Sequence, residues 1–355
     1  VVGEVWLCSG QSNMVYKMKL PGNYALPAKG ENLAALELRK PANEMIRVFV
    51  VRRDDKPVSW KVADGESLAE VSAVGYFFGK ALQEQLDVPV GIITAAVNGS
   101  RIETWTSKEA YEHSPVFGPQ LKEGEGKMDG MIPGGRYETM VLPLIPFAIK
   151  GCLWYQGESN LNNPQVYKRL FPAMVRSWRK EWNQGEFPFY YVQIAPYDYG
   201  RKNADKTEAA EIRQVQLECL KEIPNAGMVV TADIGNRTCV HPSDKESVGK
   251  RLALWALAKT YQRSGTPYSG PLYKSFTIDK EKIIVEFDYA EMGMTSYDRE
   301  IVGFEIAGKD GIYYPAKAVL FDNKTKVMLT SDQVPEPVGV KYGFRNYQPL
   351  NLFSN

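Results

Sequence analysis

The sequence predicts a three-layer α/β/α protein: a parallel sheet covered by helices on both faces, with a small β-rich unit at the C-terminus. Two observations predict this class. Apolar runs of strand length alternate with longer amphipathic runs up to about residue 262, as in a sheet whose crossovers are helices. Beyond residue 262 the runs are short and turn residues separate them, which is typical of antiparallel strands. With 355 residues the chain has room for two domains, and we expect them at 1–262 and 263–355.

The expected elements follow in order along the chain. Strands of the parallel sheet are predicted at 3–8, 46–51, 90–95, 148–155, 187–193 and 227–232. Helices are predicted at 72–86, 165–182, 207–221 and 245–262, with Ser243 as the N-cap of the last. A turn cluster at 264–267 precedes β-like runs at 282–287, 301–306, 316–320 and 326–329. Residues 121–137, rich in glycine and charge, are expected to form a surface loop.

Composition excludes several classes of partner. The net charge of +1 gives no basic surface for nucleic acid, and no apolar run has the length of a membrane span. Cys8, Cys152, Cys219 and Cys239 show no paired metal spacing, and the chain has only two histidines, so we expect no metal and no cofactor. Because the chain begins inside a strand-like run, the lack of a visible signal peptide says nothing about export.

Residues 3–14 are the most informative stretch of the chain. An apolar run ends abruptly in loop formers, so Ser12 lies just past the carboxyl end of a predicted buried strand, where open α/β sheets bind ligands. Serine needs a base to act as a nucleophile, and the chain offers His113 and His241. His241 follows the strand-like run at 227–232. The alternative interpretation is a helix-capping serine and a loop histidine.

Three blocks occur in a fixed order along the chain. They are GQSNM at 10–14, WYQGESN at 154–160, and His241-Pro242 followed by Lys245. Together they resemble the sialate O-acetylesterase and acetylxylan esterase group of carbohydrate esterases, within the SGNH hydrolase superfamily. The resemblance runs from residue 1 to about 262 and continues more weakly to about 352. It implies the flavodoxin-like sheet of that superfamily.

The resemblance implies a role for several individual residues of this chain. Ser12 would be the nucleophile and His241 the base that takes its proton. The oxyanion would be met by the backbone N–H of Ser12, by Gly99 and by the side-chain amide of Gln156. Family members usually carry two glycines where this chain has Asn98-Gly99. The plain alternatives are a turn glycine at Gly99 and a loop-bracing amide at Gln156.

The acid of the triad is where the chain departs from the family. Relatives usually carry an Asp two or three residues before the histidine, and here those positions are Thr238 and Cys239. The group that orients His241 would be Glu158, Asp233 or a main-chain carbonyl; with the carbonyl, Ser12 and His241 act as a dyad. Glu158 ranks first among the three because it shares a loop with Gln156.

Substrate recognition is predicted from aromatic and basic residues near these loops. Trp105 and Tyr155 offer ring faces for a sugar, and Arg101 offers a guanidinium for a carboxylate. The alternatives are buried aromatics and a structural charge. The expected function is that of a serine esterase acting on acetylated carbohydrate, with O-acetylated sialic acid as the favoured substrate. The protein is expected to be secreted or periplasmic. An acetylxylan esterase, or a carbohydrate-binding module with little hydrolysis, are the alternatives.

Overall fold

The computed structural model describes residues 3–19, 33–52, 58–112, 133–200 and 202–355. Residues 121–132 of the glycine-rich segment, and His113, lie outside these ranges. The chain forms two compact units. The first, here called the hydrolase unit, consists of Val1–Ile194, Glu211–Val229 and His241–Thr266. The second, the β unit, consists of Ala195–Ala210, Val230–Val240 and Pro267–Asn355. The division of the chain at residue 262 stays a prediction.

The hydrolase unit is built on a seven-stranded sheet of order β3-β2-β4-β1-β5-β6-β7. Its strands are β1 (Glu4–Gly10), β2 (Asn43–Val50), β3 (Lys61–Ala63), β4 (Val90–Ala96), β5 (Gly151–Tyr155), β6 (Phe189–Val192) and β7 (Ala226–Val229). Neighbouring strands run parallel except β3, a three-residue antiparallel edge strand that the sequence did not indicate. Because β1 lies between β4 and β5, the strand order changes direction there, which is the point at which such sheets bind ligands.

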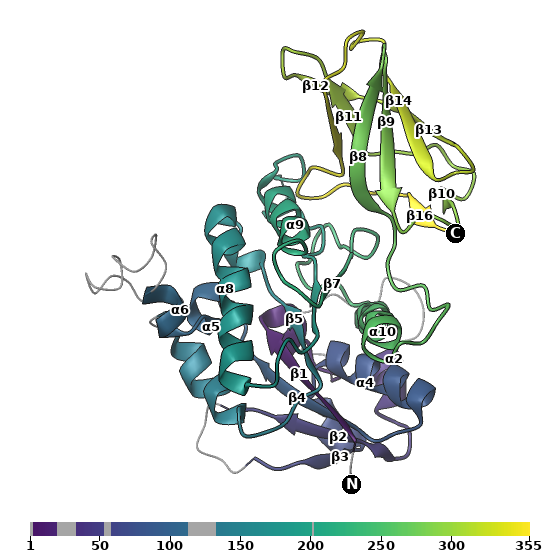
Figure 1. Ribbon diagram of the computed structural model, residues 1–355. Coiled ribbons are helices and arrows are strands. Elements are labelled where there is room, and N and C mark those ends of the chain that lie inside the picture. Colours follow the sequence, from purple (N-terminus) through teal and green to yellow (C-terminus); the bar gives the residue numbers. More distant parts are fainter. Residues whose placement is uncertain (1–2, 20–32, 53–57, 113–132, 201) are drawn as a thin grey trace. The chain divides into compact units, whose positions relative to one another are not determined.

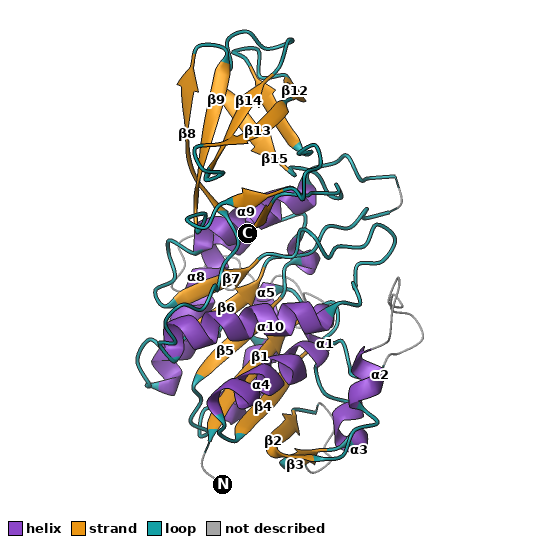
Figure 2. Cartoon of the chain, turned by 90° about the vertical axis from the view of Figure 1, so that its right-hand side faces the viewer, coloured by secondary structure: helices purple, strands orange, loops and turns teal. Residues whose placement is uncertain are grey.

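Helices cover both faces of this sheet (Figure 1; Figure 2). One face carries α4 (Ala73–Leu86) and α10 (Lys245–Trp255), which pack on each other. The opposite face carries α5 (Ile102–Trp105), α6 (Lys108–Glu112), α8 (Pro164–Trp182) and α9 (Glu208–Cys219). Short helices complete the unit: α1 (Ser12–Val15), α2 (Leu33–Glu37), α3 (Gly65–Ala69), η1 (Tyr137–Val141), η2 (Leu142–Leu144) and η3 (Glu158–Asn160). The predicted α/β/α class is confirmed.

The helix predicted at 245–262 differs in detail from the helix observed. The N-cap is Asp244, not Ser243, because the Asp244 carboxylate accepts from the Ser247 N–H. The α-helix ends at Trp255 and continues as a π-helical turn, η4 (Ala256–Thr260). His241, the predicted base, lies just before the start of α10.

Large apolar side chains bury both faces of the central strands. On the α4 face, Trp6 of β1 packs edge-on against Phe78, with ring centroids 4.9 Å apart. On the α8 face, Trp154 of β5 contacts Phe171 and Trp178. Burial on both faces explains why these strands are continuous apolar runs in the sequence, with no alternation of polar residues.

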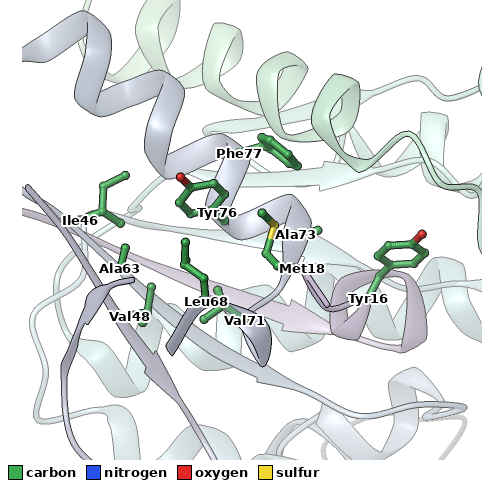
Figure 3. Packing of buried hydrophobic residues seen from close by; sticks show 10 residues of the cluster. All are labelled: Tyr16, Met18, Ile46, Val48, Ala63, Leu68, Val71, Ala73, Tyr76 and Phe77. Atoms are coloured by element: carbon green, nitrogen blue, oxygen red, sulfur yellow. The ribbon is translucent and has the colours of Figure 1, made fainter. Parts of the chain in front are cut away.

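A separate cluster of buried side chains holds the chain immediately after α1 (Figure 3). Tyr16 and Met18 are almost fully buried there, among residues of β2, β3, α3 and α4. The members are Tyr16, Met18, Ile46, Val48, Ala63, Leu68, Val71, Ala73, Tyr76 and Phe77. The Ser12 turn is therefore anchored by β1 on one side and by this cluster on the other.

The β unit contains antiparallel sheets, as the short runs predicted. One sheet has the order β13-β14-β9-β8, a second β12-β11-β15, and β10 pairs with β16. The strands are β8 (Leu272–Asp279), β9 (Lys282–Asp288), β10 (Met294–Thr295), β11 (Phe304–Ala307), β12 (Tyr313–Pro315), β13 (Lys317–Phe321), β14 (Lys326–Thr330), β15 (Gly339–Tyr342) and β16 (Phe353–Ser354). Buried Asn346 ties residues 195–210 into this unit through hydrogen bonds with Tyr197, Lys206 and Ala209.

Candidate active site

Three loops of the predicted site leave the sheet at the carboxyl ends of neighbouring strands. Gly10, the last residue of β1, is in register with Ala96 of β4 on one side and with Tyr155 of β5 on the other. Ser12 follows Gly10 by two residues, Gly99 follows Ala96 by three, and Gln156 follows Tyr155 directly. The parallel sheet thus brings the nucleophile loop and both predicted donor loops to one edge.

Backbone hydrogen bonds join the three loops at this edge. The Gln11 N–H donates to the Tyr155 carbonyl at 2.9 Å, and the Val97 N–H donates to the Gly10 carbonyl at 3.0 Å. Gly10 has φ of 135°, and a Cβ at this position would lie 2.1 Å from the Tyr155 carbonyl oxygen. Only glycine allows the chain to turn out of β1 so close to β5.

Ser12 begins the four-residue helix α1 and is 8% exposed. The sharp turn out of β1 presents the residue beyond the strand end while its neighbours Gln11 and Asn13 are buried.

Gln11 is an organising residue that the sequence analysis missed. Its Oε1 accepts three hydrogen bonds: from Gln156 Nε2 at 3.0 Å, from the Gly157 N–H at 3.2 Å and from the Ser159 N–H at 3.1 Å. A single side-chain oxygen next to Ser12 therefore accepts from three donors of the loop after β5. Its place beside Ser12 in the motif was the only signal in the sequence.

Gln156 lies where the resemblance places it, fully buried between the loops. Its Nε2 donates to Asn160 Oδ1 at 2.8 Å, to Gln11 Oε1 at 3.0 Å and to the Ser100 carbonyl at 3.2 Å. Three acceptors already surround an amide that has two hydrogens. In this arrangement Gln156 braces the loops, and it would have to give up one of these contacts to donate to an oxyanion.

Gly99, a predicted backbone donor, lies in an open turn of the loop after β4. Its φ is 68°, which favours glycine, and nothing lies within 4 Å of the place where a Cβ would stand. Asn98 beside it is exposed, so the departure from a second glycine occurs on the open side of the loop. The loop has space for a ligand to approach.

Arg101, a predicted substrate residue, belongs to a buried polar network. Its Nη2 donates to Glu103 Oε1 at 3.0 Å, and Asn160 Nδ2 donates to Glu103 Oε2 at 2.8 Å. Asn160 Oδ1 also accepts from the Ile102 N–H at 3.0 Å. Arg101 and Glu103 therefore link the loop after β4 to the loop after β5.

Trp105 and Tyr155, the predicted sugar platforms, are both fully buried. Trp105 Nε1 donates to Ser100 Oγ at 2.9 Å, and its ring meets Trp154 edge to face. The Tyr155 ring lies beneath Lys245 Nζ, 5.3 Å from the ring centroid. Neither ring face is open to a sugar, because the packing of the strand ends covers both.

His241 lies four residues before Lys245, whose side chain contacts the loop that carries Ser12. Lys245 Nζ donates to Asn13 Oδ1 at 2.6 Å, and Asn13 directly follows Ser12. Burial of the imidazole, together with the positive charge of Lys245, lowers the pKa of His241 to about 4. A histidine that stays neutral at neutral pH is able to accept a proton.

Glu158 contacts Asn13, the residue after Ser12. Its Oε1 accepts from Asn13 Nδ2 at 2.5 Å, and Oε2 has no hydrogen-bond partner among the described residues. Burial raises the pKa of the Glu158 carboxyl, against the opposing effect of the Asn13 hydrogen bond and the Lys245 charge. The carboxylate braces Asn13, and its assignment as the group that orients His241 stays a prediction.

Thr238 and Cys239 have no carboxylate, as the sequence shows, and the structure explains the local turn. Asn236 Oδ1 accepts from the backbone N–H groups of both residues, at 2.9 and 3.1 Å. This side chain sets a tight turn within the β unit. Over the described ranges, no group of three or more His, Cys, Asp and Glu could hold a metal ion, and no helix is long and apolar enough to cross a membrane.

Comparison with known proteins identifies the family. The sequence profile of "carbohydrate esterase, sialic acid-specific acetylesterase" matches residues 2–258, which is most of the chain. The chain belongs to this family. The resemblance inferred from the three motifs is therefore confirmed.

Relatives of this esterase family match the chain over most of its length. Sialate O-acetylesterase of Homo sapiens is 29% identical over 81% of this chain, and that of Mus musculus is 26% identical over 97%. The chain spans 59% of the length of the human protein and 73% of the mouse protein. A solved structure, a carbohydrate acetylesterase from Xanthomonas citri, is 32% identical with a TM-score of 0.85, covering 99% of this chain and 78% of that one.

Proposed function

We propose that this chain is a serine esterase that removes O-acetyl groups from carbohydrate and that O-acetylated sialic acid is its preferred substrate. The single observation that carries the proposal is the turn of Ser12 out of β1, between the loops after β4 and β5. The matched family and the activities for which its relatives are named support the same chemistry. A carbohydrate substrate also supports export of the protein from the cytoplasm.

The proposed reaction proceeds by acyl transfer. Ser12 Oγ attacks the acetyl carbonyl carbon while His241 takes the serine proton, and a tetrahedral oxyanion forms. Collapse of this intermediate breaks the bond to the sugar oxygen, which receives the proton from His241 and leaves as a hydroxyl. Water, deprotonated by His241, then attacks the acetyl-Ser12 ester; the bond to Ser12 Oγ breaks, Oγ takes the proton back from His241, and acetic acid leaves and ionises to acetate. The chain of proton transfers needs a neutral His241 at the start, which its low pKa provides.

Backbone N–H groups of Ser12 and Gly99 are the proposed donors to the oxyanion. The open space around Gly99 supports its role. Gln156 is proposed as a third donor that exchanges one of its three acceptors for the oxyanion. Glu158 is the first candidate for orienting His241, because its Oε1 accepts from Asn13 while its Oε2 has no hydrogen-bond partner among the described residues; a main-chain carbonyl is the alternative.

A cavity of about 780 Å³ in the hydrolase unit supports an anionic sugar as the substrate. It is lined by Val15 after the nucleophile helix and by Val97 and Asn98 before Gly99. Its charged lining side chains are Lys17, Lys19, Arg52, Lys61, Glu66 and Glu70. Lys17 pairs with Glu70, which leaves three basic groups and one acidic group in this list. Ser12, Gly99 and His241 do not line the cavity, so its excess positive charge supports a binding place beside the site for the carboxylate of a sialic acid rather than for neutral xylan.

The test is the change Ser12→Ala, assayed on p-nitrophenyl acetate. We expect kcat to fall by about three orders of magnitude or more, as in other serine hydrolases, while the fold is unchanged by circular dichroism. Ser9→Ala is the matched control. Ser9 lies in β1, its hydroxyl has no partner among the described residues, and its removal should leave the rate at the wild-type value.

Substrate choice is tested by acetate release from O-acetylated sialic acid and from acetylated xylan. Faster release from sialic acid supports the proposal, and faster release from xylan would make the chain an acetylxylan esterase. Binding of either sugar without turnover of any ester, or Ser12→Ala activity within about tenfold of wild type, would contradict the serine esterase.

A further inference from the structure

Lys245 is buried to an unusual degree for a lysine. Only 1% of the residue is exposed, although lysine is almost never buried without a partner. It lies in the first turn of α10, four residues after His241, and its helix is capped by Asp244. A charge placed in the interior has a cost, so its contacts should explain what it holds.

The contacts of Lys245 converge on the nucleophile loop. Nζ donates to Asn13 Oδ1 at 2.6 Å and lies over the ring faces of Tyr16 and Tyr155, 4.9 and 5.3 Å from the centroids. Both rings offer a cation–π contact to a desolvated ammonium. Tyr16 is itself fixed in the buried cluster after α1 (Figure 3).

Asn13 connects this lysine to Glu158. Its Oδ1 faces the Lys245 Nζ, and its Nδ2 donates to Glu158 Oε1 at 2.5 Å, so both ends of the amide are committed. The amide is fully buried and can adopt only one of its two flip states, because the opposite state would place Nδ2 against the lysine. The peptide that joins Ser12 to Asn13 is held by this fixed side chain.

We propose that Lys245 is a positioning residue for the esterase reaction: it locks Asn13, and with it the Ser12 turn, to the helix that follows His241. The proposal rests on the proposed function. It connects two residues 232 positions apart in the sequence and explains why a lysine occupies a buried site. Lys245 acts through its hydrogen bond with Asn13.

The charge of Lys245 has a second consequence, on the base. Two acidic residues flank this lysine: Asp244 caps α10 by accepting from the Ser247 N–H, and Glu158 of η3 accepts from Asn13. Burial and Lys245 together lower the pKa of His241. A positive charge disfavours the imidazolium, so its removal raises this pKa, and at acidic pH less of the enzyme holds the neutral base.

The test is Lys245→Met, which keeps the length and apolar stem of the side chain and removes the donor and the charge. With p-nitrophenyl acetate we expect kcat to fall about tenfold to hundredfold through misplacement of Ser12, with KM little changed. The acidic limb of the kcat/KM profile should move to higher pH. A purely structural lysine would not move this limb.

Lys250→Met is the matched control, since Lys250 is on the same helix with 60% of its side chain exposed and pairs with Glu246. It should leave kcat and the pH profile unchanged. Lys245→Arg keeps the charge and should keep the acidic limb at its wild-type position. Asn13→Ala breaks the link but keeps the charge, so kcat should fall without a shift of the limb; this variant carries the test if Lys245→Met does not fold.

The outcomes separate this inference from the proposed function. An inactive wild-type protein, or an active Ser12→Ala variant, would contradict the esterase itself. An active wild-type enzyme whose Lys245→Met variant keeps both kcat and the acidic limb would overturn the role of Lys245 and leave the esterase standing. An unchanged kcat in Asn13→Ala would also overturn it.

Discussion

At the scale of single residues, uncharged amides hold the candidate site together. The Oε1 of Gln11 accepts from one side chain and two backbone N–H groups, and Asn160 and Asn13 each bridge two loops. Amides suit this position because they donate and accept at once without adding a charge near the nucleophile. Buried polar networks of this kind stabilise only when each member is satisfied.

The first prediction concerns Gln11→Leu. The change removes the acceptor of the buried Gly157 N–H and the half-buried Ser159 N–H and leaves both donors unpaired, so the free energy of unfolding should fall by about 3 kcal/mol. Urea denaturation measures it. Gln165→Leu, at an exposed position of α8, should change stability by less than about 0.5 kcal/mol. Equal effects of the two changes would show that the acceptor is not needed.

At the scale of elements, the end of β1 determines where Ser12, the proposed nucleophile, lies. The strand is buried on both sides by β4 and β5, and its last residue turns the chain out of the sheet with φ of 135°. The carbonyl of Tyr155 lies so close to Gly10 that the turn has no room for a side chain. The position of Ser12 therefore depends on a close approach of two backbones.

The second prediction concerns Gly10→Ala. Since the new Cβ would lie 2.1 Å from the Tyr155 carbonyl oxygen, β1 and β5 must separate, and we expect a loss of about 2 kcal/mol or more together with loss of esterase activity. Gly185→Ala has φ of 69° but open space around it, so it isolates the backbone penalty of about 1 kcal/mol. Thermal unfolding and the ester assay check both. If Gly10→Ala matches Gly185→Ala in both measurements, the close approach does not constrain the site.

At the scale of the whole molecule, the half-buried His241, the proposed base, links the proposed chemistry to acid stability. The folded pKa of His241 is about 4, below the ordinary value of 6.5, so the unfolded chain binds this proton more readily. The folded state therefore loses stability as pH falls from about 6.5 to about 4, and the loss is complete below the folded pKa. The same low pKa keeps the base neutral over most of the acidic range.

The third prediction follows from this linkage. His241→Gln removes the titrating group, so its unfolding midpoint in urea should fall less between pH 7 and pH 4 than that of the wild type. Other groups titrate in both proteins and cancel in the difference. Parallel midpoint curves for the two proteins across this window would contradict a lowered pKa at His241.

Local patterns in the sequence determined much of the sheet and the order of the site. Runs of four to eight apolar residues predicted the parallel strands, because burial on both faces is a property that each strand carries in its own residues. Parallel strands end at one edge, so Ser12, Gly99 and Gln156 were expected to lie near each other. The three-residue strand β3 was missed because it is too short to show a pattern.

Only the tertiary structure decided what each side chain does at that edge. Trp105 and Tyr155 are covered, Gln156 is committed to three acceptors, and Glu158 contacts Asn13. Burial and the choice of hydrogen-bond partner depend on segments distant in sequence, as Lys245 and Asn13 show. A local pattern records the preference of a residue for the interior but not the neighbour that it meets there, and this neighbour determines its chemistry.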